Sequence, residues 1–307
     1  MSAEDQLSHY AAQQDTVLTI GTFDGVHIGH QAILDRLRIE CEQTGLMPTV
    51  VTFSNHPRSV LPPGENTDQI IPLDDRLQLL QENGVQHTVV LDFTMEFSKL
   101  RAREFILYLI RHLRMKSLVI GPDFTLGFKR EGDVTRLGEL SKELGFSLRI
   151  IDTKIFGELS IRSRILREMI LTGDVKTARE MMGRPFCLKG KVSVGDRRGR
   201  ELGFPTANLQ PNKGLVIPGN GIYAARTKIA GRLWPTVVSI GVRPTFGGEY
   251  RTIEAYIMDF NENIYDLWIE LEFVEFIREE IKFDSVDELI KQMHHDVEAS
   301  SLILYRN

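Results

Sequence analysis

Short apolar runs alternate with longer amphipathic stretches in the first half of the chain. Five runs rich in β-branched residues lie at residues 16–21, 48–53, 87–93, 117–121 and 147–153. Between these runs, apolar residues recur at helical spacing, as in Ile33, Leu34, Leu37 and Cys41. Strands separated by helices predict an α/β domain with a doubly wound parallel sheet. In such sheets, ligands bind at the carboxyl ends of the strands.

The pattern changes after a helical region at residues 160–182, which the Gly173–Asp174 pair is expected to divide into two helices. Strand-like runs separated by turn residues then follow at residues 187–194, 201–209, 221–229, 235–242, 251–260 and 266–277. Runs of this kind without intervening helices predict a small antiparallel β-barrel. A last amphipathic stretch begins with a capping box at Ser285 and Glu288, which predicts a C-terminal helix. We therefore expect an N-terminal domain at residues 1–183 and a barrel domain at residues 184–307.

The composition of the 307 residues is that of a globular protein, with 42% hydrophobic and 26% charged residues. The net charge of −5 gives no electrostatic basis for nucleic acid as the main ligand. Cys41 and Cys187 form no disulfide framework, and no uncharged apolar stretch is long enough to span a membrane. We therefore expect a cytoplasmic protein with neither a nucleic-acid nor a membrane partner.

The segment GTFDGVHIGH at residues 21–30 follows the first predicted strand and opens the first predicted helix. The segment contains three glycines, Gly21, Gly25 and Gly29. Glycine allows the backbone to bend tightly and to approach a ligand. The helix N-terminus presents unpaired N–H groups and a positive dipole end to a phosphate. His27 and His30 can lie on one side of this helix start and donate hydrogen bonds to phosphate oxygens. Two other interpretations stand beside this one: a glycine-rich turn with two structural histidines, and a zinc site that recruits His56.

The segment GKVSVGDRRGRELGFPTANL at residues 190–209 carries the second candidate site. Gly195, Gly199 and Gly203 recur in a basic stretch, which is typical of a loop that closes over phosphates. Thr206 and Asn208 lie two residues apart, so an extended chain places both side chains on one face. A hydroxyl and an amide oxygen on one face are suitable ligands for Mg²⁺ bound with substrate phosphates. Taken alone, the Thr-x-Asn pair is more typical of an ordinary exposed strand or turn than of a metal site.

The N-terminal motif resembles the adenylyltransferase module of bacterial bifunctional riboflavin kinase/FAD synthetases, within the His-x-Gly-His nucleotidyltransferases. Two further segments are similar to that family, TFSNHPR at residues 52–58, with Asn55 in place of a proline, and GPDFTLGFKREGD at residues 121–133. The resemblance implies a Rossmann-like domain in which His27 and His30 are catalytic. It implies ATP and phosphate binding by Gly21, Phe23, Asp24, Gly25, Gly29, Ser163 and Arg167. It implies flavin binding by His56, Asp123 and Phe124.

One segment departs more strongly from the family. The family has Ser-Ser-Thr-x-x-Arg before the helix that leads to the Gly-Asp pair, where this chain reads RSRILR at residues 162–167. Ser163 and Arg167 align, whereas Arg162 and Arg164 replace a serine and the threonine. The family uses this segment to contact ATP phosphates, and added positive charge is electrostatically compatible with a triphosphate.

The C-terminal segment resembles the riboflavin kinase signature, and the later segments follow in the order of that family. The resemblance implies Glu254 as the general base for the terminal ribityl hydroxyl, and Thr206 and Asn208 as the Mg²⁺ ligands. It implies ATP or flavin binding by Gly195, Gly199, Gly203, Phe204, Pro205 and Arg278. Without the resemblance, Glu254 reads as a charged residue facing outward on a strand, and Arg278 as half of a surface ion pair.

The expected function is therefore bifunctional: phosphorylation of riboflavin to FMN by the C-terminal domain, and adenylylation of FMN to FAD by the N-terminal domain. ATP is the co-substrate of both steps, and pyrophosphate leaves in the second. Two alternatives stand beside this expectation. One is a riboflavin kinase whose altered Arg162–Arg164 segment has weakened adenylylation. The other is a non-catalytic regulator that binds flavin or nucleotide.

Overall fold

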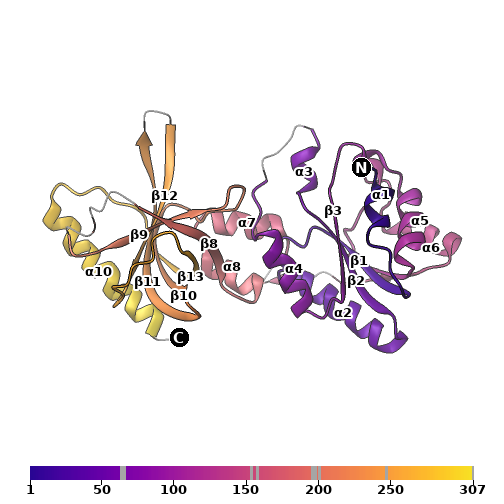
Figure 1. Ribbon diagram of the computed structural model, residues 1–307, viewed down its shortest axis with the longest axis horizontal. Coiled ribbons are helices and arrows are strands. Elements are labelled where there is room, and N and C mark those ends of the chain that lie inside the picture. Colours follow the sequence, from indigo (N-terminus) through magenta and orange to yellow (C-terminus); the bar gives the residue numbers. More distant parts are fainter. Residues whose placement is uncertain are drawn as a thin grey trace. The chain divides into compact units, whose positions relative to one another are not determined.

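The computed structural model describes residues 1–62, 67–152, 155–156, 159–194, 199, 202–245 and 248–305. The chain forms two compact units, residues 1–163 and residues 164–307. In Figure 1 the first unit runs from indigo to magenta along the chain, and the second ends in yellow. The residues 164–183, which the sequence assigns to the end of the first domain, belong to the second unit by their contacts.

The first unit is the predicted doubly wound α/β domain. Its strands are β1 (Thr16–Ile20), β2 (Met47–Phe53), β3 (His87–Leu91), β4 (Met115–Ile120), β5 (Ser147–Ile150) and the short pair β6 (Ile155–Phe156) and β7 (Leu159–Ser160). Its helices are α1 (Ala3–Ser8), α2 (Ile28–Thr44), α3 (Pro57–Val60), α4 (Leu73–Glu82), α5 (Ala102–Leu113) and α6 (Val134–Leu144), with 3₁₀ turns η1 (Phe97–Lys99) and η2 (Phe128–Arg130). The five-stranded sheet has the order β3-β2-β1-β4-β5, and all its pairs are parallel. The five predicted strands are confirmed.

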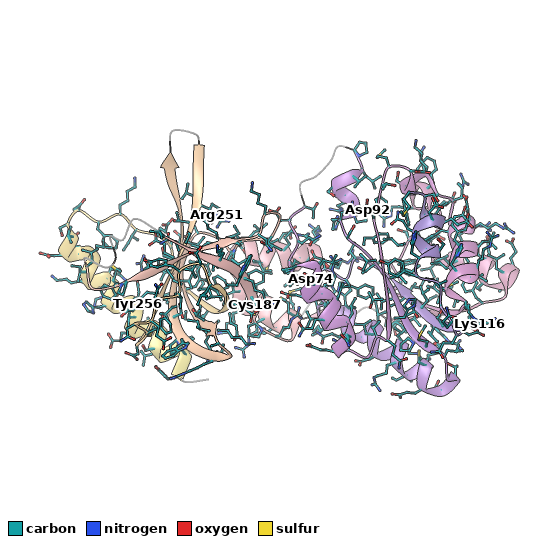
Figure 2. The ribbon with its side chains drawn as sticks, in the orientation of Figure 1. Asp74, Asp92, Lys116, Cys187, Arg251 and Tyr256 are labelled. Atoms are coloured by element: carbon teal, nitrogen blue, oxygen red, sulfur yellow. The ribbon has the colours of Figure 1, made fainter. Side chains whose placement is uncertain are left out.

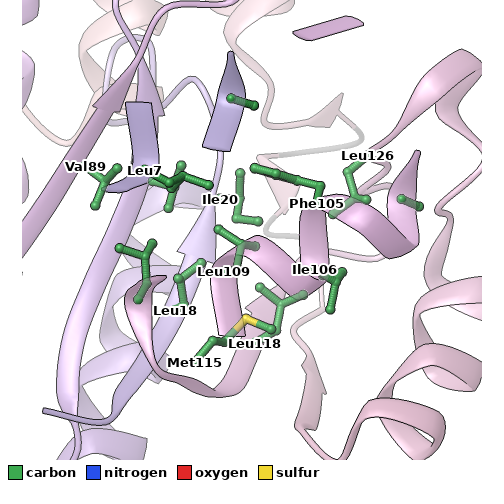
Figure 3. Packing of buried hydrophobic residues seen from close by; sticks show 14 of the residues in the cluster. Leu7, Leu18, Ile20, Val89, Phe105, Ile106, Leu109, Met115, Leu118 and Leu126 are labelled. Carbon is green, nitrogen blue, oxygen red and sulfur yellow. The ribbon is translucent and has the colours of Figure 1, made fainter. Parts of the chain in front are cut away.

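Hydrophobic residues bury both faces of this sheet. All five residues of β1 are buried, as expected for a central parallel strand covered on both sides. Leu18 and Ile20 are two residues apart on β1, so both point to the face covered by α1, α5 and α6. There they share one core with Phe105 and Leu109 of α5 (Figure 3). Burying side chains of this size contributes about 1.5–3 kcal/mol each to folding. The strand order changes direction between β1 and β4, so the topological switch point of the sheet lies between these two strands.

The second unit is the predicted antiparallel barrel. Its strands are β8 (Phe186–Ser193), β9 (Thr206–Pro211), β10 (Gly221–Ile229), β11 (Arg232–Thr245), β12 (Gly248–Ile257) and β13 (Trp268–Arg278). Its helices are α7 (Ser163–Leu171), of which all but the first residue lie in this unit, α8 (Val175–Met182) and α10 (Val286–Tyr305). The strands close in the order β10-β11-β12-β9-β8-β13. Figure 1 shows α10 lying along the barrel, which it packs against through β10, β11 and β13.

The predicted helix boundaries follow from local chemistry. Gly173 has a positive φ of 86° between α7 and α8, and Gly183 ends α8 in the left-handed region, a conformation that costs glycine little. Ser285 accepts a hydrogen bond from the N–H of Glu288 at 3.2 Å and so caps α10, as predicted. Within the described residues, no helix is long and apolar enough to cross a membrane.

Candidate active sites

A cavity of about 360 Å³ opens at the carboxyl ends of β1, β4 and β5. It therefore lies at the switch point between β1 and β4, where the doubly wound fold predicts a ligand. Eight residues predicted for the nucleotide and flavin sites line it: Gly21, Phe23, His27, Gly29, His30, Asp123, Phe124 and Ser163. The structure thus brings three separate sequence motifs together around one cavity.

The loop between β1 and α2 has a backbone that is held in unusual conformations. Phe23 and Val26 have positive φ angles of 49° and 36°, and Gly25 has one of 82°. Positive φ is costly for residues with a Cβ, so the surrounding structure has to stabilise this loop. Phe23 is 1% exposed, and its ring packs against His30 at 5.0 Å between centroids.

His27 is the N-cap of α2, and its contacts orient the rings of both His27 and His30. Its Nδ1 accepts a hydrogen bond from the backbone N–H of His30 at 3.2 Å. An accepting Nδ1 means that the neutral ring carries its proton on Nε2. The two imidazole rings stack with 3.7 Å between centroids and an angle of 13°. A Cβ added at Gly29 would approach the His27 ring to 3.1 Å, so the small residue between the histidines allows this close packing.

Asp24 holds the same loop in place through hydrogen bonds to other segments of the chain. Its side chain is buried, and Oδ1 accepts hydrogen bonds from the N–H groups of Ile70 at 2.9 Å and Ile71 at 3.4 Å. Its carbonyl oxygen accepts a hydrogen bond from Ser163 Oγ at 2.9 Å. The residues that line the cavity include neither Asp24 nor Gly25. The contacts of Asp24 join the loop to two distant segments of the first unit.

In the barrel, a cavity of about 370 Å³ lies between the strands and α10. Five of the predicted kinase residues line it: Gly199, Phe204, Thr206, Glu254 and Arg278. Thr206 Oγ1 donates a hydrogen bond to Glu254 Oε2 at 3.1 Å across the pair formed by β9 and β12. Glu254 therefore borders a cavity instead of facing outward from an ordinary strand.

A second cavity of about 400 Å³ adjoins the same strand β9. Pro205, Thr206 and Asn208 line it together with residues 260–265. Thr206 lines both cavities, Glu254 only the first and Asn208 only the second. In the strand register Glu254 lies directly opposite Asn208. Three oxygen-bearing side chains thus mark the boundary between two cavities of one barrel.

The family of the chain follows from comparison with known proteins. The FAD synthetase family model matches residues 9–165, and the riboflavin kinase family model matches residues 182–304. The chain belongs to the bifunctional riboflavin kinase/FMN adenylyltransferase family. The predicted family is confirmed, and both of its parts are enzymes.

Relatives with this name cover nearly the whole chain. The enzyme from Haemophilus influenzae is 35% identical, over 94% of this chain and 94% of its own length. The enzyme from Bacillus subtilis is 34% identical over 92% of this chain and 91% of its own, and that from Escherichia coli 35% over 93% and 92%. A crystal structure of a Streptococcus pneumoniae protein named macrolide-efflux protein superposes with a TM-score of 0.91 and 31% identity, covering 96% of each chain. That name describes the other protein, and the shared fold is the one described above.

Two departures from the family pattern have a visible structural basis. Asn55 stands where the family has a proline, and its amide group accepts from Phe93 N and donates to Phe93 O, both at 2.9 Å. Proline could make neither bond, so the substitution ties the end of β2 to the segment after β3. Arg162 donates from Nη2 to Asp123 Oδ2 at 2.5 Å, and Arg164 to Glu168 at 2.7 Å along α7. Arg162 lines the first cavity, whereas Arg164 is absent from the residues that line it.

Some predicted residues lie elsewhere in the described structure. His56 caps α3 through Nδ1, which accepts from Arg58 N at 3.1 Å, and it is not among the residues that line the first cavity. Arg167 lies on α7 in the second unit. Gly203 has a positive φ of 87° at the turn before Phe204. Gly195 lies outside the described residues.

Arg278 is held far more firmly than a surface ion pair would be. Its Nε and Nη2 donate to the two carboxylate oxygens of Asp296 at 2.8 Å and 2.6 Å, and the Asp296 side chain is only 6% exposed. Gln292 also donates to this carboxylate, at 3.0 Å. This bidentate pair joins the end of β13 to α10, and both members line the first barrel cavity. Asp296 was not predicted, because its partner is distant in sequence.

Two further residues that line the cavities were not predicted. Tyr256, labelled in Figure 2, lines the barrel cavity and packs edge-on against Phe204 at 5.2 Å between centroids. Arg130 lines the first cavity and donates from Nε to Thr125 Oγ1 at 2.9 Å. Arg130 stands in the family motif at residues 121–133, so the sequence carried a signal for it.

Arg76 is a buried cation beneath the loop between β1 and α2. It is 2% exposed, and Nη1 donates to the carbonyl oxygens of Thr22 at 2.6 Å and Phe53 at 3.0 Å. Burial lowers the pKa of this guanidinium, and the neighbouring Asp24 carboxylate opposes that change. The available sequence signal was an arginine on the apolar face of the helix formed by Leu73–Glu82.

Among the described residues, one group of side chains lies close enough together to hold a metal ion. It consists of Cys187 on β8 and of Glu270 and Glu272 on β13. Lys189 forms an ion pair with Glu270 at 3.4 Å in this group. Burial raises the pKa of the Cys187 thiol to about 12, so at neutral pH the sulfur is protonated and a poor ligand. The hypothetical zinc set of His27, His30 and His56 does not form such a group.

Proposed function

We propose that this chain makes FAD from riboflavin in two ATP-dependent steps, with a separate site in each unit. Membership of a bifunctional family supports both activities. The single observation that carries the kinase assignment is the Thr206–Glu254 contact at the boundary of two cavities of about 370 and 400 Å³. One cavity offers room for the phosphoryl acceptor and the other for the donor, with the transfer position between them.

In the kinase step, Glu254 is the general base that takes the proton from the terminal ribityl hydroxyl. A carboxylate suits this role because phosphoryl transfer requires mainly positioning, charge neutralisation and a group that accepts a proton. Thr206 orients the carboxylate through its hydrogen bond of 3.1 Å. Phe204 and Tyr256 provide an aromatic wall against which a planar flavin ring can pack.

Mg²⁺ fits the donors at this boundary. The Thr206 hydroxyl, the Asn208 amide oxygen and the nearby Glu254 carboxylate are hard oxygen ligands of the type that Mg²⁺ prefers. Bound there with the nucleotide, the ion would neutralise charge on the transferring phosphoryl group. Thr206 and Asn208 are the residues that would hold it, and Glu254 would remain available to the substrate hydroxyl.

In the adenylylation step, the FMN phosphate attacks the α-phosphorus of ATP, and pyrophosphate leaves. The N-terminus of α2 and the rings of His27 and His30 supply positive potential and N–H donors at one wall of the cavity. Such donors stabilise the charge that develops on the phosphate oxygens. Ser163 belongs to the nucleotide side, and Asp123 and Phe124 to the flavin side.

One assay tests the proposal. The protein is incubated with riboflavin, ATP and Mg²⁺, and the flavins are separated by chromatography over time. FMN should appear first and FAD after it, and FMN supplied directly should yield FAD. A protein that accumulates FMN and never forms FAD would support the kinase-only alternative, and flavin binding without ATP consumption would support the regulator.

A further inference from the structure

Arg162 and Asp123 form an ion pair inside the lining of the first cavity. Arg162 precedes α7, and Asp123 follows β4. The guanidinium Nη2 lies 2.5 Å from Asp123 Oδ2, and the two side chains are 56% and 65% exposed. An ion pair with this exposure is weak, because water and salt screen both charges. Its two members can therefore exchange partners when a ligand enters.

Arg164 provides a direct contrast two residues along the chain. Its Nη1 lies 2.7 Å from Glu168 Oε1, with side-chain exposures of 62% and 51%. This pair lies along the surface of α7, and neither of its residues lines the cavity. The two arginines are matched in type and exposure, and only one of them faces the site.

The other groups around the cavity favour a polyanion next to Arg162. His27, His30 and Arg130 line the same cavity, and α2 begins at its wall. The carboxylates that line it are Asp123 and Asp152. A triphosphate concentrates several negative charges on oxygens that accept paired hydrogen bonds from a guanidinium, so it competes strongly with one exposed carboxylate.

We propose that Arg162 is a nucleotide-phosphate ligand that exchanges partners: ATP draws it away from Asp123, and this releases the Asp123 carboxylate for the flavin substrate. Arg162 thereby couples the two substrates, and ATP binds before FMN in the productive order. The inference rests on the proposed adenylylation. Asp123 acts on the flavin side as an acceptor for N–H or hydroxyl groups, and it does so only after Arg162 has moved.

Initial rates of FAD formation from FMN and ATP test this exchange without interference from phosphorylation of riboflavin. R162S should raise the KM for ATP about tenfold, the loss expected for one charge-assisted contact, with a much smaller change in kcat. D123N should lower the KM for ATP, because it removes a carboxylate that competes with the nucleotide for Arg162, and raise the KM for FMN. R164S, the matched control, should keep the wild-type values.

The substrate order gives a second readout. In the wild type the apparent KM for FMN should fall as ATP is raised, and R162S should remove this dependence. A wild-type KM for ATP in R162S, or an equal effect in R164S, would overturn the exchange. Thermal unfolding of each variant checks that the first unit is intact.

A wild-type protein that forms no FAD would contradict the proposed adenylylation itself. Calorimetric titration with α,β-methylene-ATP and Mg²⁺ then tests Arg162 alone. Weaker binding at one site in R162S and unchanged binding in R164S would support the assignment, and identical isotherms would reject it.

Discussion

Thr206 and Glu254 are joined by a hydrogen bond of 3.1 Å between neighbouring strands of the barrel, although 47 residues separate them in the chain. Thr206 lies at the start of β9, and Glu254 lies on β12 opposite Asn208. The pairing of these strands places a hydroxyl, an amide and a carboxylate at the boundary of two cavities. Phosphoryl transfer needs such a boundary, with the donor on one side and the acceptor on the other.

Replacement of this carboxylate should separate the two activities. E254Q keeps the shape of the side chain and removes the proton acceptor, so kcat for riboflavin phosphorylation should fall about 10²- to 10⁴-fold. FAD formation from FMN should stay near the wild-type rate. Parallel assays of the two steps measure the effect, and E298Q on the exposed side of α10 is the control. A loss of both activities in a folded E254Q protein would contradict the assignment of the steps to separate units.

The opposite separation is expected for the histidine pair. H30A removes one imidazole next to the N-terminus of α2, and kcat for FAD formation should fall about 10²- to 10³-fold, as for the loss of one charge-stabilising donor. Riboflavin phosphorylation should be unchanged. The exposed His9 offers a control through H9A. If H30A formed FAD at the wild-type rate, the imidazole would have only the packing role seen in its stacking on His27.

The Arg278–Asp296 pair should be important for the stability of the barrel. D296N leaves the partly buried guanidinium without its carboxylate, at a cost of roughly 3–5 kcal/mol in the free energy of unfolding. The KM for riboflavin should also rise, because both residues line the cavity. Urea unfolding and kinase kinetics measure the two effects. The double variant R278M/D296L should recover part of the stability but not the KM, whereas full recovery of both would show that the pair acts only through packing.

His87 should make stability depend on pH. Burial lowers the pKa of this histidine, and its Nδ1 is buried without a hydrogen-bond partner in the described structure. The unfolded chain therefore binds the proton more tightly than the folded one, and the stabilising contribution present above about pH 6.5 is lost as the pH falls through the lowered folded pKa. One such group changes the free energy by at most about 1.4 kcal/mol per pH unit. Urea midpoints at about pH 7.5 and 5.5 should fall less for H87Q than for the wild type; equal falls would contradict this role.

The boundary between the units can be tested with two fragments. Residues 164–307 include α8, whose buried face packs on β13 and β8 through Val175, Ala178 and Met181. This fragment should fold alone and phosphorylate riboflavin. Residues 184–307 correspond to the boundary expected from sequence, and their loss of α8 should lower the melting temperature. Equal melting temperatures for the two fragments would show that α8 does not stabilise the barrel.

The strands, the fold class of each half and the motifs that carry the family could all be predicted from the sequence. These are local properties: hydrophobic periodicity, turn residues and the spacing of glycine, histidine and threonine are all visible within short windows. The closing helix, with its cap at Ser285, was predictable for the same reason.

Which side chains contact one another depends on how distant segments pack, and short sequence windows do not show this. Asp24 was expected in the nucleotide motif from the sequence, whereas the hydrogen bonds that its carboxylate accepts from the N–H groups of Ile70 and Ile71 become visible only in the folded chain. Arg76, Asp296 and the pairing of Arg162 with Asp123 depend on contacts between segments far apart in sequence. Such contacts arise from strand order and helix packing, and the Arg162–Asp123 pair now distinguishes the cavity-lining arginine from Arg164 on α7.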